Sequence, residues 1–255
     1  TIKSVTTTNL TAANIAEGVI VKVGDASNAS RITQVTGTFA GGYTADEIAT
    51  RTISGILSGS ASSKIYANAF FSCTRVTEAN FPSVTSIGDK AFYYCINLSI
   101  ANFPEASIIG EDTFMYCWKL ATVNCPKVVY IQSRAFEYCQ SIASISFPLA
   151  QTIQSNAFFG CSAITTASFS NVTILSTSAF AGCQSLITAK FPMVSEIAQY
   201  AFYGCYSLST ISFPIATTIG TGTFAWCKAL SIASFPSLNY ISQNAFSACT
   251  LLISL

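Results

Sequence analysis

Cysteine is the residue type in this sequence whose spacing could carry chemistry. The chain has 255 residues, ten cysteines and no histidine. Nine of the cysteines follow one another at intervals of 22 residues without an insertion: Cys73, Cys95, Cys117, Cys139, Cys161, Cys183, Cys205, Cys227 and Cys249. A thiol at a repeated position can form a disulfide, bind a metal ion, act as a nucleophile, or fill space in a core.

The three chemical roles fit this spacing poorly. An odd number of equivalent thiols cannot pair off unless alternate repeats are distorted, and disulfide geometry is strict. Zinc sites gather cysteines in close pairs or join them to histidine, and a nucleophilic thiolate needs a nearby base. We therefore expect free, buried thiols that act as small apolar residues, with no catalytic residue, no metal site and no cofactor. The tenth, Cys125, occupies an otherwise aromatic position and should leave a smaller side chain there.

Each spaced cysteine belongs to a 22-residue repeat that must position it. A phenylalanine precedes it by three residues, and an isoleucine or leucine lies five residues before that phenylalanine, as in "IGDKAFYYC", which ends at Cys95. Apolar residues nine and eleven positions after the phenylalanine share one face of a short strand, which a proline usually ends. Apolar spacing of three around "AFxxC" favours one tight helical turn. The segment before it, such as "VTSIG", fits either a second short strand or an extended corner.

A unit of this size cannot bury its apolar side alone, but stacked copies can. Parallel strands of successive copies would lie about 4.8 Å apart, so that equivalent side chains meet in ladders through the interior. The crossover rule for parallel strands favours a right-handed solenoid.

The order of these columns resembles the BspA-like leucine-rich-repeat surface proteins of bacteria, with their phrase "Ix..AFxxCxxLxxIxFP". The resemblance covers about Ala61 to Leu255. We therefore expect an α/β fold: a right-handed leucine-rich-repeat solenoid with parallel strands on its concave face, short helical turns and a small N-terminal β-rich cap. The resemblance implies adhesion to host or microbial proteins or to matrix.

Residues 1–57 are the expected N-terminal cap, and residues 58–255 the solenoid of nine repeats. We expect the cap to contain two strands, "VIVKV" and "ITQVTGTF", and a short helix, "YTADEIATR". "TISGILSGS" aligns with the later strands as a degenerate zeroth coil, because Leu57 precedes Ala79 by 22 residues. The last repeat leaves a strand edge at the C-terminal end, which predicts end-to-end self-association.

The sequence has few charged residues, which limits the classes of binding partner that it can have. The chain has 12 Lys and Arg against 11 Asp and Glu, and 9% of its residues are charged. No basic surface for nucleic acid is expected. The mean hydropathy of +0.49 does not predict a membrane span, since polar residues interrupt every apolar run well before the roughly 18 residues that a spanning helix needs. A surface rich in Ser and Thr fits an extracellular or cell-surface protein.

Two sets of outward positions could bind a protein or glycan ligand. The first lies on the predicted strands and comprises Glu78, Asn80, Asn102, Thr122, Asn124 and Lys190. The second is aromatic and comprises Tyr94, Tyr116, Tyr138 and Trp226. For each set the alternative is an ordinary solvated sheet or half-buried packing around the turn.

The sequence thus predicts a non-enzymatic recognition or adhesion module. The alternative class is a structural spacer or receptor-binding component of a phage-like particle, because "NLTAANIAEGV" and "RITQVTGTF" resemble short modules of phage tail proteins.

Overall fold

The structure is a computed structural model, and residues 54–58 and 64–253 are the part of the chain that it describes. The predicted cap lies almost wholly outside these residues, as do its two strands, its short helix and the segment that resembles phage tail modules. The end of the last predicted strand, at residues 254–255, lies outside them too. The cap, the domain boundary and the C-terminal self-association therefore stay predictions.

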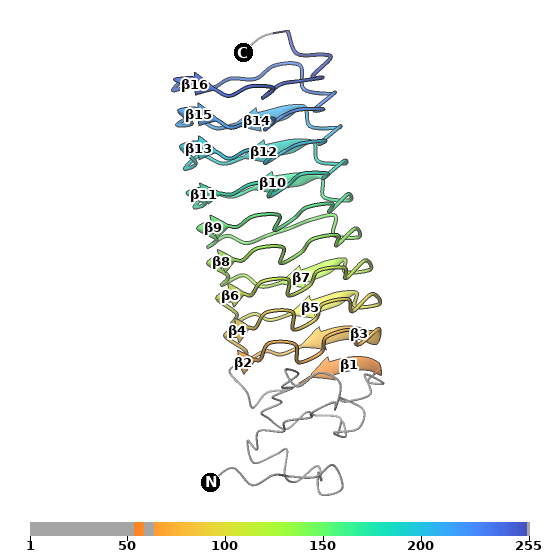
Figure 1. Ribbon diagram of the computed structural model, residues 1–255. Coiled ribbons are helices and arrows are strands. Elements are labelled where there is room, and N and C mark those ends of the chain that lie inside the picture. Colours follow the sequence, from red (N-terminus) through yellow and green to blue (C-terminus); the bar gives the residue numbers. More distant parts are fainter. Residues whose placement is uncertain (1–53, 59–63, 254–255) are drawn as a thin grey trace, which may run out of the picture.

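The described coils stack into a column with a parallel sheet along each of two sides (Figure 1). On one side, a four-stranded sheet is followed by a three-stranded sheet. The strands are β1 (Ser54–Ser58), β3 (Arg75–Asn80), β5 (Ile100–Asn102) and β7 (Thr122–Asn124), then β10 (Thr166–Ser168), β12 (Thr188–Lys190) and β14 (Thr210–Ser212). Leu57 pairs with Ala79, which confirms the zeroth coil.

The segment before each "AFxxC" phrase is a second strand, which decides between the two alternatives left open by the sequence. Nine such strands of two residues form one parallel sheet. They are β2 (Lys64–Ile65), β4 (Ser86–Ile87), β6 (Ile108–Ile109), β8 (Tyr130–Ile131), β9 (Thr152–Ile153), β11 (Ile174–Leu175), β13 (Glu196–Ile197), β15 (Thr218–Ile219) and β16 (Tyr240–Ile241). In β11 the first residue is exposed and the second buried, as the pleat requires.

The expected helical turns are wrong: residues 54–58 and 64–253 contain no helix, and hence none that could cross a membrane. In every coil the residues two before and two after the ladder phenylalanine have positive φ, as do Lys90 (56°) and Tyr94 (59°) around Phe92. A left-handed residue at every fourth position interrupts a right-handed helix. The Ala91 amide instead closes a turn on the Gly88 carbonyl, and the Phe92 amide donates to the Thr113 carbonyl of the next coil at 2.9 Å.

The core is built from columns of identical side chains, as the repeat predicts. Phenylalanine rings of adjacent coils stack from Phe70 to Phe246, with centroids 5.0 to 5.6 Å apart. A second phenylalanine column packs against the first, and Cys125 is buried within it. The coils are therefore parallel-strand β-solenoid turns, while their right-handed sense and the concave form of the strand face stay predictions.

Candidate functional site

The spaced thiols are free and packed inside the column, as the sequence predicts. All are buried except Cys249, which is half-buried. From Cys95 onward each donates its S–H to the carbonyl of the phenylalanine 25 residues earlier, at 3.0 to 3.3 Å. Burial raises the pKa of the Cys125 thiol to about 12 and that of Cys139 well above its ordinary value. Within the described ranges no cluster of three or more His, Cys, Asp or Glu could hold a metal ion.

The predicted strand-face residues gather on β3, β5 and β7, with one exception. Glu78 lies beside Ile100, and Ile100 lies beside Thr122 in the next strand. Lys190 is exposed on β12 in the separate three-stranded sheet, so the structure does not bring it to the others.

The three asparagines of this face form a hydrogen-bonded amide ladder. Asn102 Nδ2 donates to Asn80 Oδ1 at 2.7 Å, and Asn124 Nδ2 donates to Asn102 Oδ1 at 2.6 Å. Each amide group has two N–H donors and two lone pairs on its oxygen. A donor and an acceptor therefore remain on the exposed side of every rung.

The predicted aromatic residues separate into two patches. The first aromatic patch consists of Tyr93, Tyr94, Tyr116, Trp118 and Tyr138, in which the Tyr116 and Tyr138 rings stack at 5.4 Å. Trp226 belongs to a second aromatic patch with Tyr206, because Lys228 Nζ lies 5.3 Å from both ring centroids; the two rings are 43 and 44% exposed. Gly160, Gly182 and Gly204 occupy the intervening positions of the column, so no ring connects Tyr138 to Trp226.

A cluster of charges joins three coils that also carry rings of the first aromatic patch. The buried Asp112 carboxylate lies 2.7 Å from Arg134 Nε and 3.7 Å from Lys90 Nζ, while Arg134 Nη2 lies 2.6 Å from Glu111. Burial raises the pKa of Asp112 and of Glu137, although Arg134 opposes both shifts. The carboxylates of Asp112 and Glu111 thus lie between the cations of the previous and the next coil, and these ion pairs connect the three turns.

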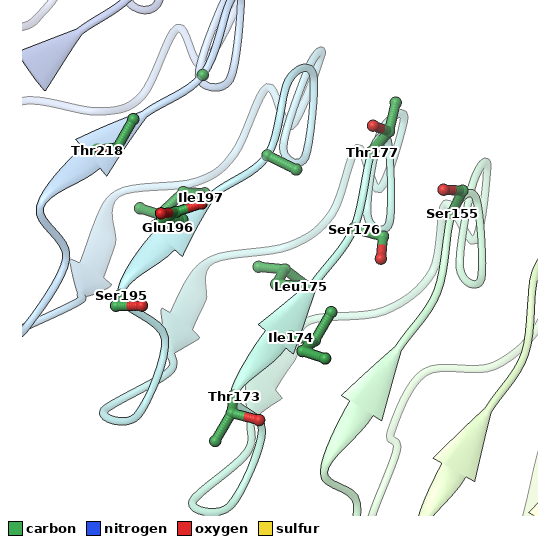
Figure 2. Close-up of a pocket in the computed structure, with 12 residues that line it drawn as sticks. Ser155, Thr173, Ile174, Leu175, Ser176, Thr177, Ser195, Glu196, Ile197 and Thr218 are labelled. Carbon is green, nitrogen blue, oxygen red and sulfur yellow. The ribbon is translucent and has the colours of Figure 1, made fainter.

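The sequence did not single out a groove on the nine-stranded sheet, shown in Figure 2. We call it the Glu196 groove; it has a volume of about 620 Å³ and is lined by residues of β11, β13, β15 and the turns beside them. It lies where the position four before the ladder phenylalanine changes from Gln132 and Gln154 to the small residues Ser176, Ala198 and Gly220. That run of small residues is the sequence feature from which the groove could have been predicted.

Comparisons with known proteins agree with this architecture. A family model described as "BspA type Leucine rich repeat region" matches residues 52–165 and 151–255. A leucine-rich repeat protein of T. pallidum has a similar structure, with 22% identity and a TM-score of 0.52 over 76% of this chain and 87% of that chain. A leucine-rich cell surface protein of Faecalibacterium prausnitzii A2-165 has 21% identity and a TM-score of 0.50 over 78% and 72%. Both likenesses concern the fold. No curated protein matches the chain.

Proposed function

The chain belongs to the BspA-type leucine-rich repeat family, and from that premise we propose that it is a non-enzymatic recognition module for a protein or glycan ligand. The charge-poor, Ser- and Thr-rich surface supports an extracellular or cell-surface location. So does the name of the similar F. prausnitzii protein, which is described as a cell surface protein.

The amide ladder of Asn80, Asn102 and Asn124 is the observation that carries the proposal. Its side chains are held in register by their own hydrogen bonds, so little conformational entropy remains to be lost when a ligand binds. Each rung offers a donor and an acceptor, which suits the amides of an extended peptide or the hydroxyls of a glycan. Glu78 and Thr122 extend this polar surface on the same strands.

The test is to find a ligand and then remove the ladder. Binding of the protein to a glycan array and to immobilised fibronectin, laminin and collagen would identify one. We expect the triple variant Asn80→Ala, Asn102→Ala, Asn124→Ala to bind that ligand at least about tenfold more weakly, since several hydrogen bonds are lost.

The matched control is Ser168→Ala with Ser212→Ala, which removes hydroxyls from the corresponding positions of β10 and β14. If the triple variant binds the ligand as tightly as the wild-type protein and has the same melting temperature, the ladder is excluded as the binding surface.

The alternative of a phage-like structural component depends on residues outside the described ranges, and no observation favours it.

A further inference from the structure

The Glu196 groove has the size and lining of a small-ligand site. Its volume of about 620 Å³ falls within the range of roughly 300 to 1,000 Å³ that is typical of such sites. Six hydroxyl side chains line it: Ser155, Thr173, Ser176, Thr177, Ser195 and Thr218. Ile174, which is 55% exposed, adds an apolar surface beside them on β11 (Figure 2). The groove therefore combines many donors and acceptors with a small apolar wall.

Glu196 is an isolated carboxylate in this groove. Between Tyr138 and Trp226 the only charged residues are Lys190 and Glu196, and Lys190 lies on β12 in the other set of strands. In the part of the chain that the structure describes, no cation forms an ion pair with Glu196. An ionised carboxylate is an acceptor only, and its two oxygens can accept hydrogen bonds from two neighbouring hydroxyl groups.

An exposed tyrosine pair adjoins the groove. Tyr200 follows Glu196 by four residues in the same coil, and its ring covers Gly222, two residues after Gly220 of the groove lining. The Tyr200 and Tyr203 rings meet nearly at right angles, with centroids 5.9 Å apart. Exposed aromatic faces beside a polar site can pack against the C–H faces of a ligand. The tyrosine pair thus lies in the coil of Glu196, and the Tyr200 ring reaches the next coil two residues beyond Gly220 of the groove lining.

We propose that the Glu196 groove, together with Tyr200 and Tyr203, binds a neutral saccharide chain, at a site separate from the amide ladder. Sugar hydroxyls pair with the Ser and Thr hydroxyls and with the Glu196 carboxylate, while sugar C–H faces pack on Ile174 and the tyrosine rings. The single carboxylate in an uncharged surface repels an acidic saccharide. It supplies too little negative charge to hold a polycationic peptide.

The binding experiment is calorimetric titration of the whole chain with maltohexaose, cellohexaose and hexa-N-acetylchitohexaose, and with trilysine as a cationic comparison. We expect at least one hexasaccharide to bind. Ala198→Gln should abolish this binding, because it places in the groove the residue that earlier coils carry as Gln132 and Gln154. Glu196→Gln should weaken binding about tenfold, the effect of losing hydrogen bonds to a charged acceptor.

Glu105→Gln is the control, since this exposed carboxylate pairs with Lys127 away from the groove. It should leave the hexasaccharide affinity unchanged, and all variants should keep the wild-type melting temperature. Absence of binding at millimolar hexasaccharide would overturn the proposal, as would full binding by Ala198→Gln or binding of trilysine alone. The asparagine variants of the amide ladder test a different surface, so either proposal can fail without the other.

Discussion

At the scale of single residues, the repeated cysteine is explained by its small size and its weak hydrogen-bond donor. The Phe136 carbonyl accepts the Cys139 amide at 3.0 Å and the Cys161 S–H at 3.0 Å. The same pattern recurs through the column, so each thiol satisfies a buried carbonyl of the previous coil while it packs as an apolar group. Burial that holds the proton on sulfur also makes these thiols poor nucleophiles.

Glu137 is a residue whose burial should cost stability. It stands between Met115 and Phe159 in the same column of successive coils, and its Oε2 is buried without a hydrogen-bond partner. We expect Glu137→Met to raise the free energy of unfolding by about 1 kcal/mol at pH 7, because an unsatisfied buried polar atom is removed. Urea denaturation measures this change.

The increase in the free energy of unfolding expected for Glu137→Met should depend on pH. Burial raises the pKa of Glu137 above its ordinary value of 4.5 in the folded protein. The folded state therefore binds the proton more tightly than the unfolded state, and the wild-type protein gains stability as the pH falls through this raised pKa toward 4.5. The advantage of Glu137→Met should shrink across that window. A gain that stays constant from pH 7 to pH 4 would contradict this explanation.

At the scale of elements, the turn around each ladder phenylalanine depends on two residues with positive φ, one two positions before the phenylalanine and one two positions after it. Most of these positions are occupied by residues other than glycine, including Tyr94, Tyr116, Tyr138 and Trp226. Such a conformation costs roughly 1 to 3 kcal/mol for a non-glycine residue and persists where surrounding contacts offset it. The stacking of Tyr116 on Tyr138 and the position of Lys228 over Trp226 are contacts of this kind.

A comparison of substitutions at two glycines distinguishes the cost of backbone strain from the cost of a clash with a neighbouring ring. Gly204 (φ +69°) and Gly222 (φ +59°) are both left-handed, but a Cβ at Gly204 would meet nothing within 4 Å, whereas one at Gly222 would lie 2.5 Å from Tyr200 Cε1. We expect Gly204→Ala to cost about 1 kcal/mol from strain alone. Gly222→Ala should cost about 1 to 3 kcal/mol more, because the ring must move.

Urea denaturation of both variants, repeated with Tyr200→Ala in each, provides the comparison. The difference between the two glycine positions should disappear once the ring is removed. A difference that survives would assign the extra cost to the backbone.

At the scale of the whole molecule, the solenoid is nearly one-dimensional, because each coil contacts mainly the coils beside it. The ladder rings illustrate this: Phe158 stacks on Phe136 at 5.2 Å and on Phe180 at 5.0 Å. Stability should then be a sum of coil terms and nearest-neighbour terms.

Double-mutant cycles on the phenylalanine ladder test this description. Phe158→Ala alone should cost about 3 to 5 kcal/mol, as a buried aromatic truncation does. Combined with Phe180→Ala in the next coil, the effects should depart from additivity by about 0.5 to 3 kcal/mol. Phe114→Ala and Phe202→Ala, four coils apart, should add to within about 0.5 kcal/mol. Strong coupling of the distant pair, measured by urea denaturation, would show that cooperativity extends beyond neighbours.

The sequence by itself determined the register of the column, since an uninterrupted period of 22 dictates which side chains meet. The phenylalanine stacks, the free thiols and the alignment of Asn80, Asn102 and Asn124 all follow from it. The sequence could not distinguish a helical turn from a stacked turn, because both place apolar residues at intervals of three. The difference lies in the φ angles of residues such as Lys90 and Tyr94, whose side chains do not require a left-handed backbone.

Only the tertiary structure decided how the surface is divided. It placed Lys190 in a separate sheet and opened the groove at Glu196. These features depend on how side chains from several coils fill or leave space together. A period fixes the position of each residue in its coil, whereas the shape of a surface depends on the volumes of its neighbours.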